Sequence, residues 1–185
     1  MGNLNVVLLH DQMIDKAGKL VTTSLTLIDV HDISRSCCTY AIPRFFVAHP
    51  SEALRKLART LHQHWETGFG AAYNPKRKQA LEVARIVASL DEAIHTIELE
   101  SGRLPTLIAT SAKREPGRVG FSDLKRMVHE QDAEYLLMLG TGWGMCDELL
   151  ARADLFLAPI EGPVPYNHLS VRSALAIMLD RIFGI

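Results

Sequence analysis

Residues 136–144 read Leu-Leu-Met-Leu-Gly-Thr-Gly-Trp-Gly, an apolar run that leads directly into a turn with glycine at alternate positions. Four apolar side chains in succession predict a strand that is buried on both faces. Because glycine has no Cβ, such a turn can adopt positive φ and let backbone amides approach a ligand closely. We therefore expect a ligand at this turn, and a tight strand-to-helix turn with nothing bound is the alternative.

The surroundings of the turn narrow the class of ligand. No Gly-Lys-Ser/Thr follows it, so it is not a phosphate-binding P-loop, and it lacks the third glycine and the later acidic residue of the dinucleotide-binding fingerprint. In an ordinary Rossmann-type methyltransferase a similar glycine turn follows the first strand, with most of the domain still to come. Here only one strand and one long helix are expected beyond the turn and its short helix, which argues against that class.

Working outward from the turn, apolar runs of strand length alternate with longer stretches of helical period. This pattern predicts an α/β fold in which helices cover a parallel sheet, as one domain spanning residues 1–185. Ligands bind such sheets beyond the carboxyl ends of the strands. We expect strands at residues 6–10, 24–29, 45–49, 106–110, 135–139 and 155–159, and helices at residues 32–40, 51–66, 76–98, 122–130, 146–152 and 169–183.

Composition limits the partners and the compartment. The formal net charge is −1, so bulk charge does not hold this chain on nucleic acid, and an RNA partner would need the short basic clusters at residues 76–78, 113–118 and 125–126. Solvated surface charge is the alternative role of these clusters. The sequence has no apolar run of membrane-spanning length and no secretory signal, which predicts a cytoplasmic protein without a membrane partner. Its three cysteines lack metal or disulfide spacing, so reduced thiols are expected.

The C-terminal residues 155–183 complete a pattern that resembles a known family. A strand leads into a Pro/Gly loop and then into a helix that Asn-His-Leu-Ser introduces at residues 167–170. Residues 169–177 resemble the third motif of the SPOUT superfamily of RNA methyltransferases, the glycine turn resembles its second motif, and residues 26–35 resemble its first. The resemblance covers nearly the whole chain.

Within that superfamily, the chain is similar to the domain fused to some bacterial tRNA guanine-N1 methyltransferases. One departure is that Cys37 and Cys38 stand where those relatives typically have a second basic residue. The resemblance implies a parallel sheet flanked by helices with a C-terminal deep trefoil knot, a homodimer, and S-adenosylmethionine as cofactor. It further implies a methyltransferase that acts on tRNA or rRNA. The alternatives are a non-catalytic SPOUT module that binds cofactor or RNA, and a methyltransferase of small molecules, which only the net charge favours.

The last helix gives a second reason to expect a homodimer. It carries more apolar surface than a solvated terminus would expose. The residues concerned are Leu175, Met178, Leu179, Ile182 and Phe183.

The resemblance also implies which residues hold the cofactor. Backbone groups of the glycine turn and of the last loop would hold its adenine and ribose, and polar side chains would line its methionine end. Helix capping is the alternative role of Asn167 and Ser170. The full set is Leu139, Gly140, Thr141, Gly142, Gly144, Ile160, Tyr166, Asn167, Leu169 and Ser170.

Arg35 is the first candidate for a catalytic residue. It matches the motif arginine that contacts the acceptor nucleotide or its phosphate, and the planar guanidinium fork suits a phosphate. A surface arginine paired with Asp32 or Asp29 is the alternative. Asp29 and His31 are the remaining candidates, as an acid/base pair, whereas one Asp and one His supply too few ligands for zinc, so no metal is expected.

Overall fold

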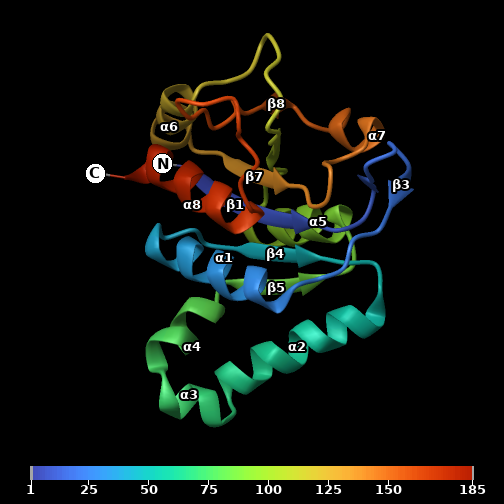
Figure 1. The fold of residues 1–185 in the computed structure, drawn as a ribbon. Helices are drawn as coiled ribbons and strands as arrows, with labels where there is room; N and C mark the ends of the chain where they lie inside the picture. The colour runs from blue at the N-terminus through green and yellow to red at the C-terminus, as the bar shows by residue number, and fades with distance from the viewer. Residues whose placement is uncertain (1, 185) are drawn as a thin grey trace.

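A six-stranded parallel sheet forms the centre of the structure, a computed structural model that describes residues 2–184 (Figure 1). The two central strands, β1 (Asn3–Leu9) and β7 (Glu134–Leu139), are almost entirely buried, as expected for a parallel sheet covered on both faces. A separate antiparallel hairpin, β2 (Met13–Ile14) and β3 (Leu20–Val21), follows β1. The order across the sheet is β5 (Ala84–Val87), β4 (Phe45–Ala48), β1 (Asn3–Leu9), β7 (Glu134–Leu139), β6 (Thr106–Ala109) and β8 (Leu155–Phe156).

Helices cover the two faces unequally. Alternate residues of β1 enter different cores: Val6 and Leu8 contribute to one, and Val7 and Leu9 to the other. The first core is covered by α1 (Leu27–Thr39), α6 (Phe121–Glu130) and α8 (Val171–Phe183), the second by α5 (Leu90–Ser101) and α7 (Asp147–Leu150). None of the helices within residues 2–184 is long and apolar enough to cross a membrane.

Three further helices form an excursion between β4 and β5. These helices are α2 (Glu52–Glu66), α3 (Phe69–Tyr73) and α4 (Pro75–Leu81), and they project from the sheet at the bottom of Figure 1. Helix α4 packs against α1, and the buried Ala58 joins α2 to the first core. The excursion is therefore anchored to the same face of the sheet as α1.

The expected helix at residues 76–98 is wrong. The chain instead forms α4, strand β5 and α5 in succession. Apolar residues at helical spacing run through the whole segment, but residues 83–87 read Val-Ala-Arg-Ile-Val, and β-branched side chains favour a strand. Ser89 then begins a new helix, because its Oγ accepts a hydrogen bond from the amide of Glu92 at 3.2 Å.

The expected strand at residues 24–29 is also wrong, because α1 already begins at Leu27. Residues 24–28 alternate polar and apolar side chains only partly, and the longer pattern has helical spacing. Val30, Ile33 and Cys37 all lie on the buried face of α1. The first motif therefore lies on a helix and does not follow a strand of its own.

Strand β8 lies between two parts of one loop. On one side the Leu157 amide donates to the Ala109 carbonyl at 2.9 Å, just after β6. On the other side the Val119 amide donates to the Phe156 carbonyl at 2.8 Å. Both partners flank the loop at residues 110–118, so the chain that leaves β8 continues between the two ends of this loop.

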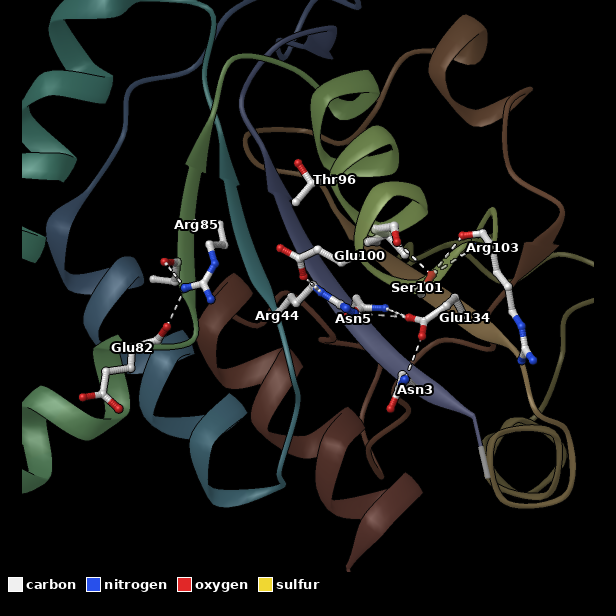
Figure 2. A network of polar contacts seen from close by, with 12 residues as sticks. Asn3, Asn5, Arg44, Glu82, Arg85, Thr96, Glu100, Ser101, Arg103 and Glu134 are labelled. Carbon is white, nitrogen blue, oxygen red and sulfur yellow. Dashed lines mark hydrogen bonds and ion pairs between the residues drawn. The ribbon is translucent and has the colours of Figure 1, made fainter.

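A polar network lies at the amino ends of the central strands (Figure 2). The buried carboxylate of Glu134 accepts hydrogen bonds from Asn3 Nδ2 at 2.7 Å and Asn5 Nδ2 at 2.8 Å, and it lies 3.4 Å from an Arg44 nitrogen. Arg44 also donates to Asn5 Oδ1 at 3.1 Å and to Glu100 at 2.6 Å. Because every partner of Glu134 is a donor, the network requires a carboxylate at this position.

We expect Glu134→Gln to destabilise the protein by about 2 kcal/mol, because the new amide group places a donor against a donor in a buried site. Urea denaturation followed by circular dichroism measures the change. Glu100→Gln is the matched control, since Glu100 contacts the same Arg44 from an exposed position, and its effect should stay below about 0.5 kcal/mol. Equal stability of Glu134→Gln and wild type would show that this network does not stabilise the sheet.

Candidate functional site

Three loops that follow adjacent strands meet at the carboxyl end of the sheet. Strand β6 pairs with both β7 and β8, so the segments at residues 110–112, 140–144 and 158–160 leave the sheet side by side. The entry to α8 is tied to them, because Asn167 Nδ2 donates to the Ala112 carbonyl at 2.7 Å. The structure thus gathers the expected cofactor segments at one edge, which we call the carboxyl-end crevice.

The glycine turn at residues 140–144 rests on the β2–β3 hairpin. The Ile14 amide donates to the Gly144 carbonyl at 2.9 Å, and the Trp143 amide donates to the Ile14 carbonyl at 3.2 Å. The Thr141 hydroxyl reaches the Leu9 carbonyl at 3.0 Å and the Thr23 hydroxyl at 2.5 Å. Leu9, Ile14 and Thr23, which support the turn, were not predicted from the sequence, because their contacts with it join segments more than 100 positions apart.

The exposed side of the turn leaves backbone open to a ligand. Gly142 has φ +62° and Gly144 has φ +114°, conformations that favour glycine. Gly142 is exposed, and within residues 2–184 its amide has no hydrogen-bond partner. A Cβ built on Gly142 would lie 3.2 Å from a Thr23 methyl carbon and 3.4 Å from the Ile14 carbonyl oxygen. The turn therefore fits a ligand that is held by main-chain groups.

The other expected cofactor residues differ in their environments. Ile160 is half-buried and packs against the first core, whereas Leu169 is exposed. Tyr166 is also exposed, with its ring edge-on to His168. Ser170 caps α8 by accepting a hydrogen bond from the Ser173 amide at 3.3 Å. Leu139 is buried at the end of β7, so only its backbone can reach the crevice.

A groove between α1 and α8 lies next to this crevice along α8. It has a volume of about 410 Å³, and its walls include Asp32, Arg35, Arg172 and Ser173. The guanidinium of Arg172 lies 3.0 Å from Asp29 and 3.5 Å from Asp32, which joins the two helices. Because Ser173 is one helical turn from the cap Ser170, the groove lies close to the amino end of α8, where the last of the expected cofactor residues stand.

Arg35 projects into the same groove with little restraint. Its side chain is 63% exposed, and its nearest carboxylate, that of Asp32, is 4.0 Å away. An exposed ion pair at this distance contributes little stability, so the guanidinium can turn toward a ligand. Arg172 was not among the sequence-predicted residues, although it lies inside the segment at residues 169–177 that carries the third motif.

His31 lies on the side of α1 that faces Trp65 of α2, and not in the groove with Arg35. Its ring is edge-on to Trp65, with ring centroids 5.8 Å apart, and burial lowers its pKa from the usual value. The structure brings Asp29 to Arg172 but does not bring His31 to Asp29. The acid/base pair expected from the sequence is therefore not assembled in this arrangement.

Two buried histidines directly follow β1 and β4, at the same carboxyl end of the sheet. The rings of His10 and His49 lie 5.2 Å apart, and His49 Nε2 is 3.0 Å from the Thr23 carbonyl. Burial lowers the pKa of His10 to about 4, so this ring is neutral at pH 7. Within residues 2–184, no group of three or more His, Cys, Asp or Glu residues is placed to hold a metal ion.

Comparison with known proteins gives matches over nearly the whole chain. The profile of a family described as SAM-dependent RNA methyltransferase matches residues 3–184. A tRNA (guanine-N(1)-)-methyltransferase of Oleidesulfovibrio alaskensis is 42% identical over 182 residues, which are 98% of this chain and 42% of that relative. An uncharacterized protein of Aquifex aeolicus is 38% identical over 182 residues, which are 98% of this chain and 89% of the relative.

Solved structures share the fold at much lower identity. The SpoU methyltransferase AviRb from Streptomyces viridochromogenes, crystallised with the cofactor AdoMet, aligns with a TM-score of 0.57 at 15% identity. The alignment covers 98% of this chain and 57% of that protein. This likeness concerns the arrangement of helices and strands.

Proposed function

Because this chain belongs to the family of SAM-dependent RNA methyltransferases and has the fold of the SPOUT enzymes, we propose that it transfers a methyl group from S-adenosylmethionine to tRNA. One observation carries the proposal: the carboxyl-end crevice and the groove holding Arg35 and Arg172 adjoin along a single turn of α8. The chain spans 42% of the length of the first tRNA methyltransferase relative, so the activity of that whole protein comes to this chain as a proposal.

The crevice would hold the cofactor chiefly through main-chain groups. The open backbone of Gly142 suits the polar edges of the adenosine, and the half-buried Ile160 offers an apolar surface to the adenine ring. Leu169 would cover the ring from the α8 side. When bound, S-adenosylmethionine supplies a methyl group on a positively charged sulfur, and the chain's task is to align an acceptor atom with it.

Arg35 and Arg172 would position the acceptor nucleotide. Both guanidinium groups border the groove, where a bidentate fork can hold a phosphate of the RNA backbone. Asp29 acts here as a positioning residue, because its carboxylate fixes Arg172 at 3.0 Å. His31 faces Trp65 and takes no part in this arrangement.

We also propose that the C-terminal segment forms a deep trefoil knot. The support is the position of β8 between Ala109 and Val119, which flank the loop at residues 110–118. The chain beyond β8 must pass between the ends of this loop before it reaches α8, which packs against α1 and α6. Such threading is rare among protein folds and sets the SPOUT arrangement apart from ordinary α/β sheets.

A homodimer is proposed on grounds that differ from those in the sequence. Leu175, Met178, Leu179 and Ile182 are buried within a single chain, so they no longer argue for a partner. The proposal instead rests on the exposed apolar side chains of the last loop, which a second subunit could cover. These are Val164, Tyr166 and Leu169. Light scattering should give twice the 20.6 kDa chain mass, and a purely monomeric species at micromolar concentration would contradict this proposal.

Nucleoside mass spectrometry tests the proposed function in cells. The tRNA of cells that lack the protein should be missing one methylated nucleoside that wild-type cells contain. Restoring the wild-type chain should restore that nucleoside. If the nucleosides are identical with and without the protein, the chain is a non-catalytic module that binds cofactor or RNA. If a methylated nucleoside is missing only from rRNA, the substrate is rRNA and not tRNA. The reduced, unpaired thiols of Cys37, Cys38 and Cys146 are consistent with the cytoplasmic location that such a role requires.

A further inference from the structure

Helix α3 exposes a stacked pair of aromatic rings that belong to neither hydrophobic core. Phe69 and Tyr73 are each 77% exposed, their ring centroids are 6.0 Å apart, and their planes differ by 20°. Large apolar side chains that gather on a surface commonly mark a binding site. Two parallel, solvent-exposed ring faces are the form of surface on which nucleic-acid bases stack.

The helices that carry this pair are basic, although the chain as a whole is not. Helices α2 to α4 hold six Lys or Arg residues and two Glu residues, a formal charge of +4, whereas the whole chain has −1. The rest of the chain is therefore at −5. The excursion that carries the exposed rings is therefore positive, and three of its basic residues, at 76–78, directly follow α3, where they would attract an RNA backbone.

The three basic clusters differ in how much of their charge is already paired. Arg114 lies 2.5 Å from Glu161, Arg118 lies 2.9 Å from Glu115, and Arg126 lies 2.9 Å from Asp123. By contrast, no ion pair involves residues 76–78 in the part of the chain that the structure describes. The cluster on α4 is thus the one in which none of the three basic side chains is paired with a carboxylate in the described residues, whereas each of the other two clusters contains a paired arginine.

The excursion is joined directly to the helix that bears Arg35. Trp65 contacts His31 of α1 on one side, and the guanidinium of Arg77 lies 4.8 Å from the Trp65 ring on another. A groove of about 480 Å³ runs between α2 and the edge strand β5, with Arg59 and Arg85 in its walls. Only helix α1 would therefore separate RNA bound along the excursion from the groove between α1 and α8 that holds Arg35 and Arg172, which we call the acceptor groove.

We propose that α2 to α4 form an RNA-binding surface, on which bases of an unpaired strand stack on Phe69 and Tyr73 while Lys76 and Lys78 contact its phosphates. This inference rests on the proposed function, since it assigns the surface that holds the RNA substrate. A protein partner would need the apolar area of the rings but not the concentrated positive charge, so the charge favours RNA.

The test compares two double variants by fluorescence anisotropy with a labelled single-stranded RNA of about 12 nucleotides. Phe69→Leu with Tyr73→Leu keeps the surface apolar but removes both ring faces, and it should weaken RNA binding about 30-fold. Phe69→Tyr with Tyr73→Phe keeps both ring faces, so it should bind within about twofold of wild type. Calorimetry with S-adenosylhomocysteine and thermal melting check that both variants remain folded.

Charge is tested separately through the salt dependence of binding. Lys76→Gln with Lys78→Gln should lower the slope of log affinity against log salt by about 1.4, because each phosphate contact on a single strand contributes about 0.7. The matched control is Arg114→Gln with Arg126→Gln, since these exposed arginines are already paired with Glu161 and Asp123, and its slope should equal that of wild type.

The outcomes separate this inference from the proposed function. If wild type methylates tRNA and the leucine double variant binds and methylates it equally well, the excursion is not the RNA surface and the methyltransferase proposal stands. Equal RNA binding together with loss of a protein partner would assign the rings to protein docking and overturn the inference. If wild type neither binds nor methylates RNA, the proposed function itself fails.

Discussion

Arg35→Ala should lower methyl transfer to tRNA at least 100-fold and leave the affinity for S-adenosylhomocysteine unchanged. The reason is the separation of tasks in the structure: main-chain groups of the carboxyl-end crevice would hold the cofactor, and Arg35 borders the neighbouring groove. Loss of one hydrogen-bond donor that acts in the transition state typically costs two to three orders of magnitude in rate. Labelled methyl transfer and calorimetric titration of the same samples measure the two quantities.

Two further variants make this result specific. Arg35→Lys should recover little activity, because an ammonium cannot reproduce a bidentate fork. Arg126→Ala is the matched control, since Arg126 is 64% exposed and pairs with an aspartate three positions earlier, as Arg35 does. Full activity of Arg35→Ala would reduce Arg35 to a surface charge and remove it from the acceptor groove.

Gly142→Val should weaken S-adenosylhomocysteine binding about 30-fold or more. At φ +62° a β-branched residue is strained, and its side chain would meet Thr23 on one side and occupy the open backbone surface on the other. Strain of one to three kcal/mol is enough to shift the turn away from its binding geometry. Calorimetry at constant protein concentration gives the change in affinity.

Gly102→Val separates strain from ligand contact. Gly102 ends α5 with φ +72°, and a Cβ there would have nothing within 4 Å. It precedes β6 and so lies at the opposite end of the sheet from the crevice. Both variants should lose similar stability, but only Gly142→Val should lose the ligand. Unchanged binding by Gly142→Val would show that the glycine turn does not hold the cofactor.

The sequence predicted the elements whose patterns are local. Residues 136–144 predicted both strand β7 and the open turn, and the polar entry at residues 167–170 predicted the start of α8. Strand β5 was missed because a helical period runs through it, and the start of α1 was taken for a strand because it alternates briefly. Both errors arise from patterns of only five or six residues, which tertiary packing decides.

The parts of the site that sequence reasoning missed depend on contacts between distant segments. Arg172 reaches Asp29 across 143 positions, and Thr141 reaches Thr23 across 118. No local pattern reports such pairs. Likewise, the apolar residues of α8 suggested a partner subunit, but the sheet and α1 of the same chain already cover them.

We propose that this chain methylates RNA by using the crevice and the groove together. The most direct measurement is transfer of labelled methyl from S-adenosylmethionine to tRNA lacking the modification, catalysed by the purified wild-type chain. We predict transfer that saturates at one methyl group per tRNA of the accepting species, and that is lost in Arg35→Ala and retained in Arg126→Ala. Absence of transfer to tRNA and to every other RNA pool, by a wild-type chain that binds S-adenosylhomocysteine, would contradict the claim.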